Sequence, residues 1–203
     1  MADTKISAMT AANTPLAGTE LIPGVQGGNN VQMTVSNIVA LAGGGGTKTY
    51  AVLTPMTSQP PAANFATLDT RNSIAVLDFD TTTEEGTFWT AVMPEAASLG
   101  SGLIVKIHWM ATSATSGNCR WGAKFERMNT DEDADSFDTA TEATSATNGT
   151  SGGITTTSIT CTTIDSIAAG DPFRVWIYRD VSDAADTMAA DAELVSVEVR
   201  SAA

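Results

Sequence analysis

Alternating apolar and polar residues across positions 102–128 constrain the fold of this chain more than any other feature. In Leu103–Trp109 every odd-numbered residue is apolar, and successive strand side chains point to opposite faces of a sheet. Cys119–Arg127 alternates in the same way, with Cys, Trp, Ala and Phe on one side and Arg, Lys and Glu on the other. Between them, Thr112–Asn118 is small, polar and typical of a turn. The pattern predicts two strands at the centre of an antiparallel sheet that packs against an apolar surface.

Residues 49–203 contain further segments of this kind, separated by turn residues. Hydrophobic residues make up 42% of the chain and charged residues 16%, so its polar character comes mainly from Thr, Ser, Asn and Gly. The β-branched Thr favours strands over helices. About eight or nine short strands at this spacing are typical of a sandwich or barrel. Because the jelly roll is the common plan with eight strands, we predict an all-β, antiparallel, jelly-roll-like sandwich.

The alternation also predicts which side chains of three strands face the core. We assign to it Phe88, Val92, Phe173, Val175, Ile177, Val195, Val197 and Val199. Trp89, Trp176 and Tyr178 then lie on outer faces, where a monomeric sandwich would normally be polar. Large apolar residues in such positions indicate burial against another subunit. We therefore predict that these three residues line an oligomer interface; the alternative is that a loop of the same chain covers them.

The chain of 203 residues divides into three parts by composition. Residues 1–42 contain a short strand at Gly18–Gln26, a turn at Asn29-Asn30, an alternating segment and Ser36, which we expect to cap a helical turn. So small a segment, with few large apolar residues, buries too little surface to fold alone. Residues 43–48 begin with four glycines and read as a flexible linker. Residues 49–203 form the predicted sandwich.

The charge and the hydropathy of the chain limit the kinds of partner that it can bind. The formal net charge of −13 repels nucleic acid phosphates, so we expect no nucleic-acid partner. No apolar run reaches membrane-spanning length and no secretion signal is apparent. We expect no membrane association and a soluble protein made in a cytoplasm. The two cysteines, Cys119 and Cys161, lie in strand-like segments and are expected to be buried thiols, with a bridge between them left open.

No set of residues in the sequence identifies a catalytic centre. His108 is the single histidine, and no Gly-x-Ser-x-Gly motif supplies a serine for it. Asp131–Asp135 and the aspartates at 180, 183, 186 and 191 are acidic enough to attract calcium. They lack the EF-hand pattern, however, and are more simply solvated loops. Tryptophans on this chain could stack on sugars, although Trp109 and Trp121 fall on core faces. We assign no catalytic residue, metal or cofactor.

The first forty residues resemble the N-terminal segment of many tailed-bacteriophage virion proteins, including head and tail fibres. The resemblance lies in Lys5–Ala12, Pro15–Pro23 and Val31–Ile38. It implies that residues 1–42 attach the protein to the particle, through the major capsid protein or another virion protein. The apolar residues expected to dock are Ile6, Leu16, Leu21, Ile22, Val31, Val35 and Ile38.

The second part is similar to a β domain of phage structural proteins. The residues that carry this similarity are Ala66–Asn72, His108-Trp109, Ala134–Phe137, Tyr178–Asp180 and Ala185–Met188. It implies a homotrimeric module displayed on the virion. We therefore expect a non-enzymatic virion structural protein, a capsid decoration or head-fibre subunit, assembled in the host cytoplasm. The alternative is a tail-associated adhesin or adaptor that binds a host surface glycan, and a glycan hydrolase is a third, weaker hypothesis.

Overall fold

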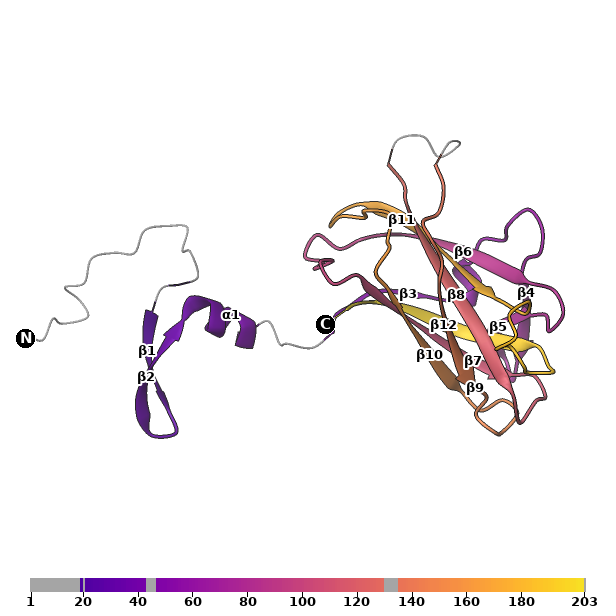
Figure 1. The fold of residues 1–203 in the computed structure, drawn as a ribbon, viewed down its shortest axis with the longest axis horizontal. Coiled ribbons are helices and arrows are strands. Elements are labelled where there is room, and N and C mark those ends of the chain that lie inside the picture. The colour runs from indigo at the N-terminus through magenta and orange to yellow at the C-terminus, as the bar shows by residue number, and fades with distance from the viewer. Residues whose placement is uncertain (1–18, 20, 43–46, 130–134, 203) are drawn as a thin grey trace, which may run out of the picture. The chain divides into compact units, whose positions relative to one another are not determined.

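The structure of the chain is a computed structural model that describes residues 19, 21–42, 47–129 and 135–202 (Figure 1). The chain separates into two units, Met1–Gly46 and Thr47–Ala203, and the division falls at the end of the glycine run. In the part of the chain that the structure describes, no helix combines the length and the apolar character needed to cross a bilayer.

The first unit contains a β-hairpin. Strands β1 (Leu21–Gln26) and β2 (Asn29–Thr34) pair antiparallel. Gly27 and Gly28 form the turn between them, with φ of +57° and +81°. Two successive left-handed residues give the type of turn that matches the twist of a hairpin, and glycine adopts that conformation without steric cost. The turn expected at Asn29-Asn30 is therefore wrong, because both residues belong to β2.

A short helix, α1 (Val35–Ala42), follows the hairpin directly. The Asn37 backbone N–H donates to the hydroxyl oxygen of Thr34 over 3.1 Å. Thr34 thus satisfies one of the N–H groups that the first turn of a helix leaves without a partner. The cap expected at Ser36 lies two residues too far along the chain, because Ser36 is already inside α1.

The second unit, which we call the β module, is a jelly roll of two antiparallel sheets (Figure 1). Its eight main strands pair as β5 with β12, β6 with β11, β7 with β10, and β8 with β9. This is the pairing of a long hairpin rolled into a sandwich, and it confirms the predicted fold class. The strands are β5 (Ile74–Phe79), β6 (Glu85–Val92), β7 (Leu103–Ala111), β8 (Asn118–Arg127), β9 (Thr141–Ala146), β10 (Thr155–Cys161), β11 (Pro172–Arg179) and β12 (Ala192–Ser201).

One sheet has six strands and the other has four. The larger sheet runs β10-β7-β12-β5-β4, where β4 is Thr67–Arg71, and β3 (Thr49–Leu53) pairs with β12. The smaller sheet runs β6-β11-β8-β9. The segments at 103–109 and 119–127 are strands as predicted, but they do not share a sheet. Each lies inside a different sheet, and the residues between β7 and β8 cross from one sheet to the other.

The core fills the space between the inner faces of the two sheets. Trp109 and Trp121, from β7 and β8, are fully buried with ring centroids 6.1 Å apart, and Phe79 packs edge-on against Trp121 at 4.8 Å. Trp89 of β6 belongs to this core, where its indole N–H donates to the Thr54 carbonyl over 2.9 Å. The expected orientation of β6 is therefore wrong. Trp89 faces inward, and Phe88 occupies the outer face.

The last strand departs from strict alternation. The register of β12 against β7 shifts between Leu194 and Ser196. Because a bulge adds one residue to one strand, Leu194 and Val197 both point into the core and are fully buried, whereas Val195 is not. Val197 and Val199 are core residues as predicted, and the assignment of Val195 to the core is wrong.

Candidate functional site

Aromatic side chains gather on the outer face of the four-stranded sheet, and we call this surface the aromatic face. Trp176 of β11 lies at its centre. The ring of Trp176 meets those of Phe88, Phe137 and Tyr178 edge to face, with centroid separations of 5.0, 5.6 and 6.3 Å. Phe137, from the segment before β9, also stacks on Phe88 at 5.6 Å. Edge-to-face contacts of this kind stabilise aromatic clusters beyond their buried area.

Two glycines within strands allow these rings to approach the sheet closely. Gly86 of β6 and Gly122 of β8 are both paired with Tyr178 of β11. A Cβ atom at Gly122 would lie 2.2 Å from Tyr178 Cζ, and one at Gly86 would lie 2.0 Å from Trp176 Nε1. Glycine inside a strand costs stability and marks close approach. Here any side chain at Gly122 would overlap the ring of Tyr178, and any side chain at Gly86 would overlap that of Trp176.

Charged side chains surround the rings, and most of them are paired. Arg174 binds Glu126 through two hydrogen bonds of 2.7 Å. Arg120 binds Glu142 over 2.6 Å. These charge-assisted contacts hold both glutamates in fixed positions beside the aromatic rings. Glu126 is fully buried, so the aromatic face offers the Glu142 carboxylate and two guanidinium groups next to a partly exposed tryptophan.

Lys124 differs from these neighbours because it contacts rings and not a carboxylate. Its ammonium lies 4.9 Å from the centroid of Trp176 and 5.2 Å from that of Tyr178. Among the described residues, no ion pair joins Lys124 to an acidic side chain. The Tyr178 hydroxyl donates to Glu142 over 2.5 Å. Burial, reinforced by this bond, raises the pKa of Tyr178, so its hydroxyl stays protonated at neutral pH.

The predicted interface residues do not share one surface. Trp176 and Tyr178 lie on an outer face as predicted, whereas Trp89 is in the core. Tyr178 is only 6% exposed within its own chain. The contacts of Lys124, and of Phe137 with Trp176, show that residues of the same chain cover much of this cluster. Burial of Tyr178 therefore needs no second subunit, and an oligomer interface at Trp176 stays a prediction.

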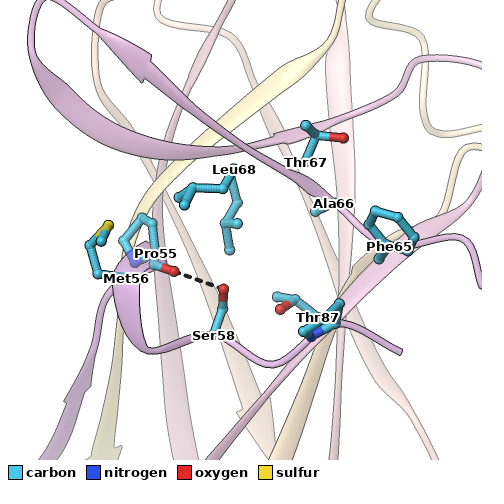
Figure 2. Close-up of a pocket in the computed structure, with 10 residues that line it drawn as sticks. Pro55, Met56, Ser58, Phe65, Ala66, Thr67, Leu68 and Thr87 are labelled. Carbon is cyan, nitrogen blue, oxygen red and sulfur yellow. Dashed lines mark hydrogen bonds between the residues drawn. The ribbon is translucent and has the colours of Figure 1, made fainter. Parts of the chain in front are cut away.

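A second surface feature is an apolar cleft of about 290 Å³ beside the edge strand β4 (Figure 2). It lies between Leu68 of β4 and the short 3₁₀ helix η2 (Pro55–Thr57). Ser58 donates to the Pro55 carbonyl over 2.7 Å, and Thr87 donates to a backbone carbonyl over 3.3 Å. These hydroxyls are already engaged, so the cleft presents few polar groups that would orient a ligand.

His108 lies on the outer face of the six-stranded sheet. Its Nδ1 is 3.0 Å from the Thr156 hydroxyl and its Nε2 is 3.4 Å from a Glu198 oxygen. Neither partner is a nucleophile held by a base and an orienting acid. Among the described residues, no group of three or more His, Cys, Asp or Glu side chains is placed to hold a metal ion.

The acidic residues near the C-terminus have structural partners. Asp186 binds the buried Arg179, and Asp183 lies 3.3 Å from Arg120. The Asp191 carboxylate accepts the Thr81 N–H over 2.9 Å, and Asp180 accepts the N–H of Ser182 over 3.1 Å. Their expected role as solvated loop residues is thus wrong for Asp186, which is almost fully buried. Residues 130–134, most of the other acidic segment, lie outside the described residues.

The two cysteines are buried free thiols, as expected from their strand positions. Burial raises the pKa of Cys161 to about 12 and raises that of Cys119 as well. Both thiols are therefore protonated at neutral pH, and a buried protonated thiol is chemically inert. No bridge joins Cys119 and Cys161.

The residues expected to dock on a virion lie in the first unit. Ile6 and Leu16 are outside the described residues. Leu21 and Ile22 of β1 are 59% and 39% exposed, although both are apolar. The other three, Val31, Val35 and Ile38, are partly buried. Val25, which the sequence pattern did not single out, is 71% exposed on the same hairpin.

Comparison with known proteins finds no similar sequence and only distantly similar structures. No family model matches the sequence, and no curated protein is significantly similar to it. One similar solved structure, from a study of specific mannan recognition by a carbohydrate-binding module, is 11% identical with a TM-score of 0.42. The match covers 78% of this chain and 99% of the other. Another, a module specific for non-crystalline cellulose, is 10% identical with a TM-score of 0.38 and coverage of 70% and 84%. Likeness at this level assigns neither a ligand nor an activity to this chain.

Proposed function

We propose that this chain is a non-catalytic virion structural protein of a tailed phage, a capsid decoration or head-fibre subunit. Residues 1–42 would dock on the particle, and the β module would be displayed from it. The observation that carries the proposal is the exposure of Leu21, Ile22 and Val25, at 59%, 39% and 71%, on one small hairpin.

The hairpin has a physical need for a partner surface. A two-stranded hairpin is at best marginally stable in water, and a unit of this size buries too little apolar surface to fold alone. Docking would bury its exposed apolar residues and supply the missing core. The resemblance of residues 5–38 to virion-attachment segments supports a phage particle as that surface.

Fractionated particles test this proposal. Tail-less heads and free tails are separated on a density gradient, and each fraction is probed with an antibody against the β module. We expect the protein on heads, and we expect loss of attachment when residues 1–42 are deleted. Val25→Asp should weaken attachment because docking would bury a charge. Val52→Asp is the matched control, since Val52 is 63% exposed on the β module.

Two results would contradict the proposal. Protein found with tails alone would reject the decoration or head-fibre role and favour the tail-associated alternative. Absence of the protein from all particles, or equal attachment of the Val25 and Val52 variants, would reject the anchor role of the hairpin.

A second candidate function, glycan binding by the β module, is favoured by the aromatic face. Sugar-binding surfaces need an apolar ring against which the sugar packs and nearby groups that exchange hydrogen bonds with hydroxyls. Trp176 supplies the ring. Arg174, held by the buried Glu126, and the pair of Arg120 with Glu142 supply the polar groups. The test is a glycan array probed with the full chain and with Trp176→Ala. If Trp176→Ala left glycan binding unchanged, the aromatic face would not be the glycan-binding site.

A further inference from the structure

One cation of the aromatic face makes no ion pair. Arg174 pairs with Glu126, and Arg120 pairs with Glu142, Asp183 and Asp180, whereas Lys124 has no ion pair among the described residues. Aromatic rings hold the Lys124 ammonium by cation–π contacts at 4.9 and 5.2 Å. Such contacts fix a cation in place without neutralising its charge. The ammonium is therefore positioned to receive an anion that comes from outside the chain.

Trp176 places an apolar ring beside that charge. Trp89, Trp109 and Trp121 are at most 1% exposed and belong to the core, whereas Trp176 is partly exposed on the outer face. A ligand recognised at both positions must carry a carboxylate or similar anion next to an apolar ring surface. Uronic acids and sialic acids have this chemistry, since each combines a carboxylate with a pyranose ring.

We propose that the aromatic face is a binding site for acidic saccharides, in which the Lys124 ammonium receives the sugar carboxylate and Trp176 packs against the sugar ring. This inference rests on the glycan-binding candidate and specifies its ligand class. Of the net charge of −13, carboxylates beyond about 8 Å are screened at physiological salt. Among the described residues, the nearer carboxylates are held by Arg174 and Arg120 and do not contact the Lys124 ammonium.

The experiment uses the full chain and an array of glycans that contain uronic acids, sialic acids or neutral sugars alone. The acidic glycan bound most strongly is then titrated at 0.15 M salt, together with its methyl ester, which has the same shape without the charge. We expect Lys124→Met to weaken binding of the acid about tenfold or more, because a charge-assisted bond is lost. The methyl ester should bind the unaltered protein about tenfold or more weakly than the acid does, because it lacks the same charge.

The matched control is Lys106→Met on the outer face of the other sheet. Lys106 also has no ion pair among the described residues, but it makes no cation–π contact there. Lys106→Met should bind the acidic glycan with an affinity within about twofold of that of the unaltered protein, since distant surface charges contribute little at this salt concentration. Trp176 gives an independent readout, because it is the tryptophan outside the core. A bound acidic glycan should reduce acrylamide quenching of its fluorescence, and Trp176→Phe should abolish that protection.

The possible outcomes separate this inference from the proposals on which it builds. Binding to neutral glycans alone would overturn the acidic-sugar assignment and leave glycan binding intact. Binding to no glycan would reject both, without touching the attachment role of residues 1–42. If Lys124→Met and Lys106→Met weakened binding of the acidic glycan equally, the site would not lie on the aromatic face. The same conclusion would follow if the bound glycan did not protect Trp176 from acrylamide.

Discussion

Arg179, the last residue of β11, is a fully buried charge of the β module. It is 0% exposed, and its guanidinium binds Asp186, which is 4% exposed, through contacts of 2.8 and 3.0 Å. It also donates to the carbonyls of Met188 and Ala190, over 2.9 and 2.8 Å. Arg179 thereby ties the segment between β11 and β12 to the sandwich.

Loss of this arginine should be strongly destabilising. Arg179→Met would leave the Asp186 carboxylate buried without its partner, which costs about 3–5 kcal/mol of the free energy of unfolding. Arg200→Met is the control, because Arg200 faces Glu198 across 3.7 Å at a partly exposed position. Exposed pairs contribute about 1 kcal/mol or less. Urea denaturation of both variants checks the difference, and equal stabilities would refute the role given to Arg179.

Asp78 makes the stability of the protein depend on pH. Burial, together with the neighbouring Asp191, Glu193 and Asp69, raises the pKa of Asp78 to about 6. The folded state then holds a proton that the unfolded state releases from about pH 4 upward. Stability therefore falls as pH rises through this window. Asp78→Asn removes the effect, so its stability relative to the unaltered protein should rise by about 1 kcal/mol between pH 4 and pH 8, after allowance for solvent screening.

Thermal or chemical unfolding of the two proteins at both pH values checks the Asp78 prediction. Glu95→Gln is a suitable comparison, since Glu95 is exposed and does not contribute to the raised pKa of Asp78. A constant difference between Asp78→Asn and the unaltered protein across the pH range would show that the Asp78 carboxyl is not the responsible group.

Gly122 is a position at which the aromatic face has no room for added volume. A methyl group there would overlap the ring of Tyr178, which is 6% exposed and has little room to move. We expect Gly122→Ala to destabilise the protein by about 1–3 kcal/mol. Gly100→Ala should have a much smaller effect, because a Cβ at Gly100 meets no atom within 4 Å. Circular dichroism melts would contradict this account if the two substitutions were equivalent.

At the scale of elements, the sequence predicts strands well where apolar residues alternate. β7, β8 and β11 follow from their alternation, because one face of each strand is buried in the core and the other is more exposed. β4 was not predicted, since its sequence, Thr-Leu-Asp-Thr-Arg, is an exposed edge with no apolar face. The bulge in β12 is equally invisible, because Val195 continues the alternation of its neighbours while the backbone changes register there.

The candidate site was predictable in part. Alternation in β11 predicts that Trp176 and Tyr178 lie on the outer face, and the structure confirms this orientation. In β6 alternation separates Phe88 from Trp89 but does not say which faces inward, because both are large aromatic residues. The contact of Phe137 with Trp176 depends on how a loop folds back over the sheet. No local pattern encodes how this loop folds. The position of Lys124 over two rings depends on the register of β8 against β11, which pairs Lys124 with Trp176.

The hairpin from β4 to β5 turns through two residues that are not ideal for it. Asn72 and Ser73 have φ of 49° and 64°, so both are left-handed. Asparagine tolerates this conformation, but serine does so at a cost that glycine avoids. We expect Ser73→Gly to stabilise the β module by about 0.5 kcal/mol. Ser113→Gly, at an exposed residue without positive φ, should not stabilise it. A lower urea midpoint for Ser73→Gly would contradict the assigned turn.

At the scale of the whole molecule, the two units differ in what holds them together. The buried apolar core consists of residues between Leu53 and Val199, all of them in the β module. The described part of the first unit instead exposes Leu21, Ile22 and Val25. The β module therefore has its own buried core, whereas no residue of the described part of the first unit belongs to that core.

This difference predicts the behaviour of the two units when they are expressed apart. Residues 47–203 should unfold cooperatively with the melting temperature of the full chain, because their core is intact without the first unit. Residues 1–46 should show little hairpin or helix by circular dichroism, since so short a unit is marginal in water. Nuclear magnetic resonance of the short fragment gives a second check, in which narrow amide dispersion is expected. A dispersed spectrum, or a module that fails to fold without residues 1–46, would contradict the division of the chain into an anchor and an independent module.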